Sequence, residues 1–455
     1  MKLAGLTRSK RLLLAVALAI LLCVAAVSGQ VIIRGDQPGP TVDDAIQLEI
    51  IDSIAYALNE VYVFPEVAKE MEKHLRKQYH NKAYKNLTAL NQFTEKLTED
   101  MREISHDLHL GIRYLPADMI IQDDRDTLSD EEQLIRLKRE LEYNNFAFEK
   151  VERLPGNVGY LKMNGFNDAN FAGRTAIAAL NFLAYCDALI IDLRDNGGGS
   201  PSMIQLITSY FFDEPKHLNS FYIRKEDSIQ QFWTQAYVEG PRMSDVDLYV
   251  LTSSYTFSAA EEFTYNLKNM ERATIVGETT GGGAHPVTRR RFNNLNVVIS
   301  LPYGRAINPI SGTNWEGKGV EPHITTTYDQ AFDMAYLEAL KKLLEKETNE
   351  NIKNRLTWKI TDLEAKLNPF EISEAVLREY VGTYGPRKVT LDNGSLLYQR
   401  EDRPKYRMVP MADNLFRFED LEYFRARFER DQNGTVIKFV GVYDNGQTDE
   451  NMKDN

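Results

Sequence analysis

The chain of 455 residues has room for two to four domains and at least one large hydrophobic core. Its formal net charge of −12, without a basic stripe, excludes a nucleic-acid-binding protein, because the chain would repel phosphate groups. Its two cysteines cannot supply a disulfide framework, and no Cys, His and carboxylate residues cluster at metal-ligand spacing. We therefore expect neither a cofactor nor a metal ion.

Residues 1–29 have the pattern of a secretory signal peptide. Basic residues precede the apolar run Leu12–Val27, and Val27-Ser28-Gly29 offers a cleavage site. The run is short for a membrane span, so we expect it to be removed and to meet the membrane only during export. The mature chain would then be periplasmic or secreted. It would have lost four positive charges and Cys23, which leaves Cys186 as a packed residue.

The next residues predict an N-terminal helical domain over residues 30–115. Residues 41–105 have the pattern of three helices, and the first has apolar residues at helical spacing from Ile46 to Val61. The segment Ser105–Arg113 (SHDLHLGIR) ends the helical pattern and enters an extended stretch.

Residues 116–330 alternate between strand and helix patterns, which predicts an α/β core with largely parallel strands. Ala188–Leu193 (ALIIDL) is nearly all apolar, as expected of a strand that is covered on both faces. The loops after three of the strands contain Gly197–Gly199, Ser258 and Gly281–Gly283. In a parallel sheet such loops meet at one edge. We therefore expect them to converge.

Three features are predicted further along the chain. Arg289–Ile299 and Leu301–Ile307 have the pattern of a hairpin. Residues 331–370 are helical and highly charged, and they predict a spacer. Residues 371–455 alternate between apolar and polar residues and contain three Asn-Gly turns, so they predict a separate antiparallel β domain.

Ser258 lies where a strand and loop lead into a helix that begins at Ala259. The first amides of a helix lack partners, and the helix dipole there favours negative charge. A hydroxyl at this point could attack a carbonyl group whose oxyanion is met by the amide of Ala259. The same residues also fit a capping box, because Glu261 follows Ser258 by three positions.

Four motifs, which occur in a fixed order along the chain, make the prediction for Ser258 more specific. They are Leu193–Gly199 (LRDNGGG), Ser258 in TFSAAEE, Val276–Gly283 (VGETTGGG) and Asn314–Pro322 (NWEGKGVEP). Together they resemble the tail-specific, or C-terminal processing, serine peptidase family. The resemblance covers roughly residues 41–330 and is strongest to the branch that contains the tricorn protease core and the interphotoreceptor retinoid-binding protein modules. It implies a Clp/crotonase-like spiral ββα core and hydrolysis of peptide bonds.

The resemblance also implies roles for the residues that match. Ser258 would be the nucleophile, and the amides of Gly198 and Ala259 would form the oxyanion hole. Gly197 and Gly199 would line the substrate-binding site beside the oxyanion hole. These roles agree with the chemistry of acyl transfer, in which preorganised amides stabilise the developing negative charge.

The general base differs between the branches of this family. Gly283 stands where the dyad enzymes carry a lysine, so a Ser–Lys dyad cannot form. The tricorn-like branch uses a histidine that matches His109. In that branch the preceding residue is a serine that orients the histidine, whereas in this chain it is Leu108. An unperturbed histidine, with a pKa of about 6.5, suits base catalysis near neutral pH.

The residue that orients His109 stays open. The glutamate of the family matches Glu316, but Asp107 or a water molecule could substitute for the missing serine. His285, beside the second glycine cluster, is the reserve base, although a histidine in such a loop is more often structural.

We therefore interpret the chain as an exported serine peptidase that acts on peptide or protein substrates through Ser258 and His109, with Glu316 in support. The leading alternative is a catalytically silent module that binds an apolar ligand or a peptide on the same fold. A third is a periplasmic scaffold whose β domain binds a partner. The substrate, the oligomeric state and the role of the C-terminal domain stay open.

Overall fold

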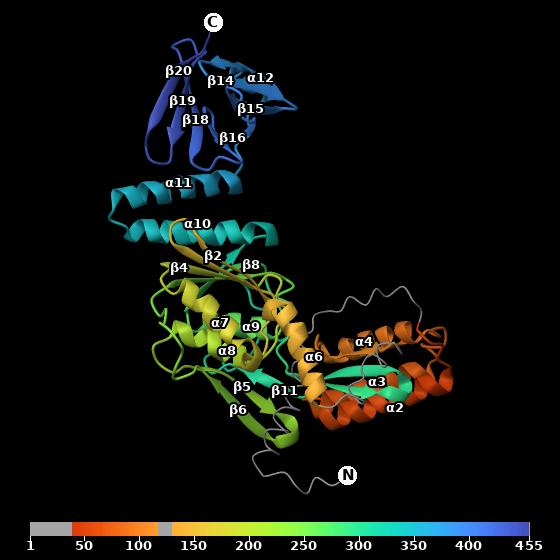
Figure 1. Cartoon of the computed structure of the whole chain (residues 1–455). Helices are drawn as coiled ribbons and strands as arrows, with labels where there is room; N and C mark the ends of the chain where they lie inside the picture. The colour runs from red at the N-terminus through yellow and green to blue at the C-terminus, as the bar shows by residue number, and fades with distance from the viewer. Residues whose placement is uncertain (1–38, 117–129, 455) are drawn as a thin grey trace. The chain divides into compact units, whose positions relative to one another are not determined.

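The computed structural model describes residues 39–116 and 130–454, so the predicted signal peptide and most of the leader lie outside the described residues (Figure 1). The chain divides into two compact units. The first runs to Arg153 and then from Gly159 to Tyr328, and the second comprises Leu154–Val158 and the residues from Asp329 onward. Among the described residues, no helix is long and apolar enough to cross a membrane.

The N-terminal part of the first unit is helical, as the sequence predicts. Its helices are α2 (Asp44–Val61), α3 (Pro65–His80) and α4 (Leu90–Ser105). Asp43 caps α2 by accepting a hydrogen bond from the amide of Ile46 at 2.9 Å. The apolar faces of the three helices pack together and against a small sheet. The helical domain therefore shares its core with strands that come from much later in the chain.

That small sheet corrects one prediction. It has the order β1 (Gly111–Tyr114), β10 (Val297–Pro302) and β9 (Val287–Phe292), with both pairs antiparallel. The hairpin is therefore β9–β10. The segment β11 (Gly304–Ile307), which we expected to pair with Arg289–Ile299, pairs instead with β5 (His217–Ile223). The alternating pattern identifies the strands but does not specify their partners.

The central sheet of the first unit has six strands. The order is β12 (Ile324–Thr325), β8 (Ala273–Gly277), β7 (Asp247–Thr252), β4 (Ala188–Asp192), β3 (Val158–Met163) and β2 (Phe148–Leu154). The pairs β12–β8, β8–β7 and β7–β4 are parallel. Every residue of β4 is buried, as its apolar sequence requires. The mixed α/β core is thus confirmed.

Three helices pack on this sheet, and a second small sheet adjoins them. The helices are α7 (Ala169–Leu183), α8 (Pro201–Thr208) and α9 (Ala259–Asn269), and their apolar residues join those of β4 and β7 in one hydrophobic core (Figure 1). The second sheet has the order β11–β5–β6, with β6 spanning Ser228–Trp233. The charged helix α6 spans Asp130–Tyr143.

The loops that follow β4, β7 and β8 converge, as expected of neighbouring parallel strands. The amide of Phe257 donates to the carbonyl oxygen of Asn196 at 3.1 Å, and the amide of Gly281 donates to that of Thr256 at 3.0 Å. These two hydrogen bonds fix the serine loop between the two glycine clusters.

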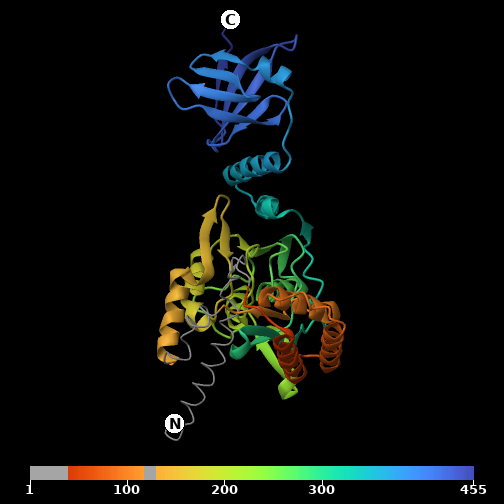
Figure 2. The same ribbon diagram turned by 90° about the vertical axis from the view of Figure 1, so that its right-hand side faces the viewer.

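The second unit contains two helices and an antiparallel sheet. The helices are α10 (Tyr328–Lys346) and α11 (Glu350–Leu367). The short helix α12 (Glu374–Glu379) leads into an antiparallel sheet, drawn in blue in Figure 2. Its eight strands pair in sequence order. They are β13 (Gly382–Tyr384), β14 (Arg387–Asp392), β15 (Ser395–Arg400), β16 (Tyr406–Ala412), β17 (Leu415–Phe418), β18 (Phe424–Arg430), β19 (Val436–Tyr443) and β20 (Thr448–Met452).

This sheet curls on itself around an aromatic core. The amide of Asp454, just after β20, donates to the carbonyl oxygen of Thr383 on β13 at 2.8 Å, which brings the last strand back to the first. Buried tyrosine and phenylalanine rings from most of the strands fill the interior. In the turn after β14, Asn393 and Gly394 both have positive φ, as a tight hairpin turn requires.

Candidate active site

Ser258 is held in a strained turn at the start of α9. Its φ of 57° and ψ of −120° lie in a region that costs a non-glycine residue about 1–3 kcal/mol. The surrounding structure fixes this conformation, because the amide of Ser258 donates to Oε2 of Glu261 at 2.8 Å. The turn places a half-buried serine side chain at the N-terminus of a helix.

The first glycine cluster approaches this serine closely. A Cβ atom on Gly198, whose φ is 109°, would lie 2.7 Å from Cβ of Ser258 and 3.0 Å from the amide nitrogen of Ala259. A Cβ atom on Gly199 would lie 2.1 Å from the carbonyl oxygen of Phe166, which also accepts a hydrogen bond from the amide of Ser200 at 2.6 Å. Both positions therefore require glycine. The structure brings together the two residues whose amides were expected to form an oxyanion hole.

The amide of Gly198 already has a partner in this structure. It donates to Oδ1 of Asn196 at 2.9 Å, and Nδ2 of the fully buried Asn196 donates to the carbonyl oxygen of Met163 at 2.8 Å. Gly197 has more space, because a Cβ atom there would find Tyr255 Oη at 3.7 Å as its nearest neighbour. An oxyanion would have to share the Gly198 amide with Asn196 or displace it.

His109 lies beside the serine loop. The centroid of its ring is 4.6 Å from that of Phe257, the residue before Ser258. A Cβ atom on Gly283 would lie 2.5 Å from Cε1 of His109. Burial lowers the pKa of His109 to about 4, so its imidazole is neutral at neutral pH. Its buried Nδ1 has no hydrogen-bond partner among the residues that the structure describes.

The two carboxylates considered as orienting groups both meet His285. Oδ2 of Asp107 lies 2.7 Å from Nδ1 of His285, and Oε2 of Glu316 lies 3.5 Å from the same atom. Asp107 reaches His109 only through the backbone, because its Oδ1 accepts the amide of His109 at 3.0 Å. Oε2 of Glu316 accepts the amide of Ala284 at 2.5 Å. His285 thus sits where Glu316 and Asp107 meet.

Two family models match the chain. One, described as peptidase family S41, matches residues 157–326, and the other, described as the N-terminal domain of peptidase S41 in eukaryotic IRBP, matches residues 44–146. Residues 157–326 form a peptidase family S41 domain. The resemblance seen in the four motifs is thereby confirmed.

Curated relatives of the S41 domain include peptidases. A "Probable CtpA-like serine protease" of Staphylococcus aureus (strain COL) is 27% identical over 199 residues, which are 43% of this chain and 38% of that protein. The tricorn protease of Thermoplasma volcanium is 26% identical over 183 residues, which are 39% of this chain and 16% of that protein. The chain thus spans under two fifths of the length of these relatives.

Solved structures with a similar fold include two proteases. The photosystem II D1 C-terminal processing protease has 15% sequence identity and a TM-score of 0.40, over 62% of this chain and 93% of that chain. Mature CPAF has 14% sequence identity and a TM-score of 0.45, over 70% of this chain and 98% of that chain.

Within the S41 domain, Glu261 ties the serine loop to the second glycine cluster. This fully buried carboxylate accepts hydrogen bonds from the amides of Ser258, Gly282 and Gly283 at 2.6–2.8 Å and from Oγ1 of Thr280 at 2.5 Å. The burial raises the pKa of Glu261, while these hydrogen bonds act in the opposite direction. The sequence identified Glu261 only as part of a capping box. Nothing in the pattern of the second glycine cluster indicated that its amides bind this carboxylate.

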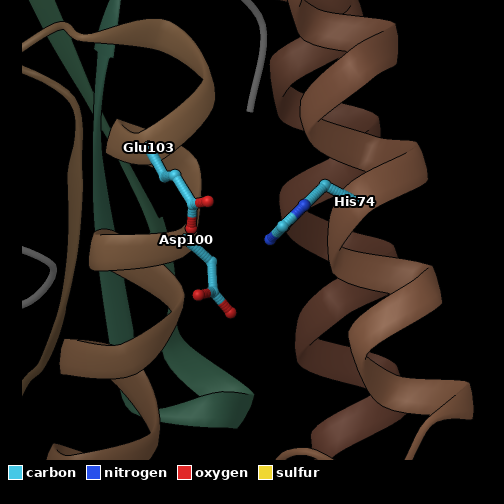
Figure 3. A group of neighbouring side chains, drawn as sticks. All are labelled: His74, Asp100 and Glu103. Carbon is cyan, nitrogen blue, oxygen red and sulfur yellow. The ribbon is translucent and has the colours of Figure 1, made fainter.

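Two groups of side chains have the residue types of a metal site. The first is His74 on α3 with Asp100 and Glu103 on α4 (Figure 3). The two oxygens of Asp100 already accept from the hydroxyl of Tyr84 at 2.6 Å and the ammonium of Lys96 at 2.9 Å, and that ammonium would repel a cation. The second group, Asp107 with His285 and Glu316, belongs to the candidate site. Neither group gives a positive reason to expect a metal ion.

Proposed function

We propose that the chain is a serine peptidase that hydrolyses peptide bonds with Ser258 as its nucleophile. The observation that carries this proposal is the close approach of Gly198 to Ser258 and to the amide of Ala259 at the N-terminus of α9. This arrangement gives an attacked carbonyl group both a nucleophile and nearby amides for its oxyanion. The family S41 domain supports the same reaction class.

In this proposal His109 is the general base. Its neutral imidazole would take the proton of the Ser258 hydroxyl during attack and return it to the leaving amine. Its place beside Phe257 supports this role, and because burial lowers its pKa the imidazole is unprotonated at neutral pH, as a base must be. The Ala259 amide would bind the oxyanion together with that of Gly198, once the latter is shared with or released by Asn196.

The setting of the reaction is part of the proposal. We propose that the mature chain acts outside the cytoplasm, because residues 1–29 have the pattern of a signal peptide. Its substrates would be polypeptides cut near their C-termini, as the printed name of the D1 processing protease suggests. Glu316 would support catalysis from beside His285.

One observation favours a second candidate, a module that binds peptides without cutting them. The amide of Gly198 is bonded to Asn196, which leaves the oxyanion site incomplete in this structure. In that case the site beside Ser258 would hold a peptide, but Ser258 would not react.

Hydrolysis of unstructured peptides by the purified chain from Gln30 onward tests both candidates. Peptides with free or amidated C-termini would be followed by mass spectrometry, and Ser258→Ala would be the matched control. We expect cleavage that the variant loses. Binding without cleavage would support the second candidate. Equal cleavage by both proteins would overturn the role of Ser258.

A further inference from the structure

His285 lies at the centre of a buried charged group. Its side chain is 5% exposed, that of Asp107 is 1% exposed and that of Glu316 is 16% exposed. The three residues come from separate segments, and the contact between Asp107 and His285 joins positions 178 residues apart. The ring of Phe64 meets the imidazole edge to face at 5.5 Å. Such a cluster is held only if its charges compensate each other.

Asp107 and His285 form the compensating pair. Burial opposes ionisation of both groups, but their hydrogen bond and the charge interactions around them together outweigh it, so the pKa of Asp107 is lowered and that of His285 is raised. Burial and the charge of Asp107 raise the pKa of Glu316 to about 7. The second carboxylate is therefore close to its midpoint at neutral pH, beside the His285 ring that is hydrogen-bonded to Asp107.

Other groups have smaller effects on the pKa values within this cluster. Arg305 acts to lower the pKa of His285, and Glu261 acts to raise that of Glu316. The hydroxyl of Tyr62 donates to Oδ2 of Asp107 at 3.3 Å. The charge of His285 also helps to keep His109 neutral.

The cluster reaches His109 from two sides. Oδ1 of Asp107 accepts the backbone amide of His109, while Oδ2 meets His285. On the other side, Oε2 of Glu316 accepts the amide of Ala284, which follows the glycine that packs on the His109 ring. The hydrogen bond from His285 to Asp107 and its ion contact with Glu316 thus each involve a segment that contacts His109.

We propose that His285 is a positioning residue, which joins Asp107 and Glu316 into one unit and thereby holds His109 against the serine loop. This role rests on the proposed peptidase function. It would replace the contribution of the orienting serine, whose place Leu108 takes. The rival role for His285 is that of the general base. The two roles differ in what the side chain must supply, a hydrogen-bond donor at Nδ1 or a site that takes up a proton.

A pair of variants at position 285 separates these roles. The Nδ2 of asparagine can occupy nearly the place of Nδ1, so His285→Asn keeps a donor to Asp107 without titrating, whereas His285→Leu removes it. For His285→Leu we expect kcat to fall about 10–100-fold, as for other supporting groups, with a much smaller change in KM. For His285→Asn we expect kcat within about threefold of wild type. Equal and severe losses in both variants would overturn the proposal.

The pH profile supplies a second criterion. In the wild type, activity should fall modestly at high pH as the His285 ring loses its positive charge and with it the charge-assisted part of its bond to Asp107, because its pKa is raised above the ordinary value. In His285→Asn this alkaline fall should be absent or reduced. An unchanged alkaline fall in His285→Asn would count against the role.

A measurement without catalysis keeps the inference separate from the proposed function. Nuclear magnetic resonance of the Ser258→Ala chain with 15N-labelled histidine should show a protected imidazole N–H that is absent from His285→Asn and altered by Asp107→Asn. This signal is expected even if the chain hydrolyses no peptide. Its absence at all pH values near neutrality would overturn the proposed link.

Discussion

A Cβ atom on Gly283 would lie 2.5 Å from Cε1 of His109, so a side chain at position 283 and the imidazole ring compete for one volume. The same atom would lie 2.2 Å from Cζ of Phe257. The position that carries a lysine in dyad enzymes is thus filled here by the two rings. The histidine and lysine solutions exclude each other sterically in this site.

Gly283→Ala should therefore displace His109 and Phe257. We expect a loss of about 1–3 kcal/mol in the free energy of unfolding, which is typical of overpacking. We also expect kcat to fall by a larger fraction than the free energy of unfolding does. Denaturant unfolding and peptide hydrolysis measure the two effects. Gly173→Ala in α7 is the matched control, because its Cβ atom would find Leu206 Cδ2 at an ordinary 3.5 Å. Wild-type activity in Gly283→Ala would show that His109 need not occupy this place.

The adjacent residues Glu261 and Glu262 should respond differently to the same substitution. Each oxygen of Glu261 accepts a backbone amide, so the NH2 group of Glu261→Gln would face a donor in either orientation. We expect it to cost about 1–3 kcal/mol of stability and to lower kcat. Glu262→Gln should be well tolerated, because Glu262 packs near Asn219 away from these amides. Equal effects in thermal melting would contradict this assignment.

The burial of Glu262 also predicts how the stability of the chain depends on pH. Burial raises its pKa to about 7, so the folded chain keeps a proton that the unfolded chain releases near pH 4.5. Its contribution to stability is present below pH 4.5 and is lost as the pH rises through 7. Glu262→Gln should gain stability relative to wild type as the pH is raised across this window. Parallel stability curves for the two proteins would show that Glu262 is ionised in the folded chain.

His109 should give a distinctive pH profile. Because burial lowers its pKa to about 4, kcat/KM should rise with pH well below 6.5 and be nearly level near neutrality. His109→Ala should lower kcat by several orders of magnitude. The exposed His106 on the same segment is the control, and His106→Asn should keep activity because asparagine tolerates its positive φ. A main ascending limb centred near 6.5 in the wild type would contradict a base whose pKa is lowered.

The C-terminal strands should fold without the rest of the chain. The sheet β13–β20 has its own aromatic core and returns to its first strand. A fragment of residues 369–455 should therefore melt cooperatively in circular dichroism. A fragment of residues 347–455, which adds α11, should melt at a higher temperature, because Arg425 stacks on Trp358 at 3.7 Å. A gradual transition in both fragments would rule out an independent domain.

The elements were predictable because their signals are local. The apolar run of β4 identifies a strand buried on both faces, and the Asn393-Gly394 turn identifies a hairpin. The convergence of the serine loop with the glycine clusters followed from the parallel order of β4, β7 and β8. These inferences need only the period of the pattern and a general rule of sheet topology.

The partners within the site were not predictable, because they join residues that are distant along the chain. The sequence left Asp107 and Glu316 as alternatives for orienting His109, and the structure places both on His285. The bond from Gly198 to Asn196 is local, but its formation depends on the loop conformation rather than on residue type. The lowered pKa of His109 follows from burial, which no residue pattern encodes.

Reaction with a serine-directed fluorophosphonate, followed by mass spectrometry of the labelled peptide, tests the central claim most directly. The reagent needs an activated serine but no knowledge of the substrate. The purified chain from Gln30 onward should be labelled at Ser258, more slowly in His109→Ala and not at all in Ser258→Ala. Labelling at another serine, or none at Ser258 under conditions in which the chain is folded, would contradict the assignment of Ser258 as a nucleophile.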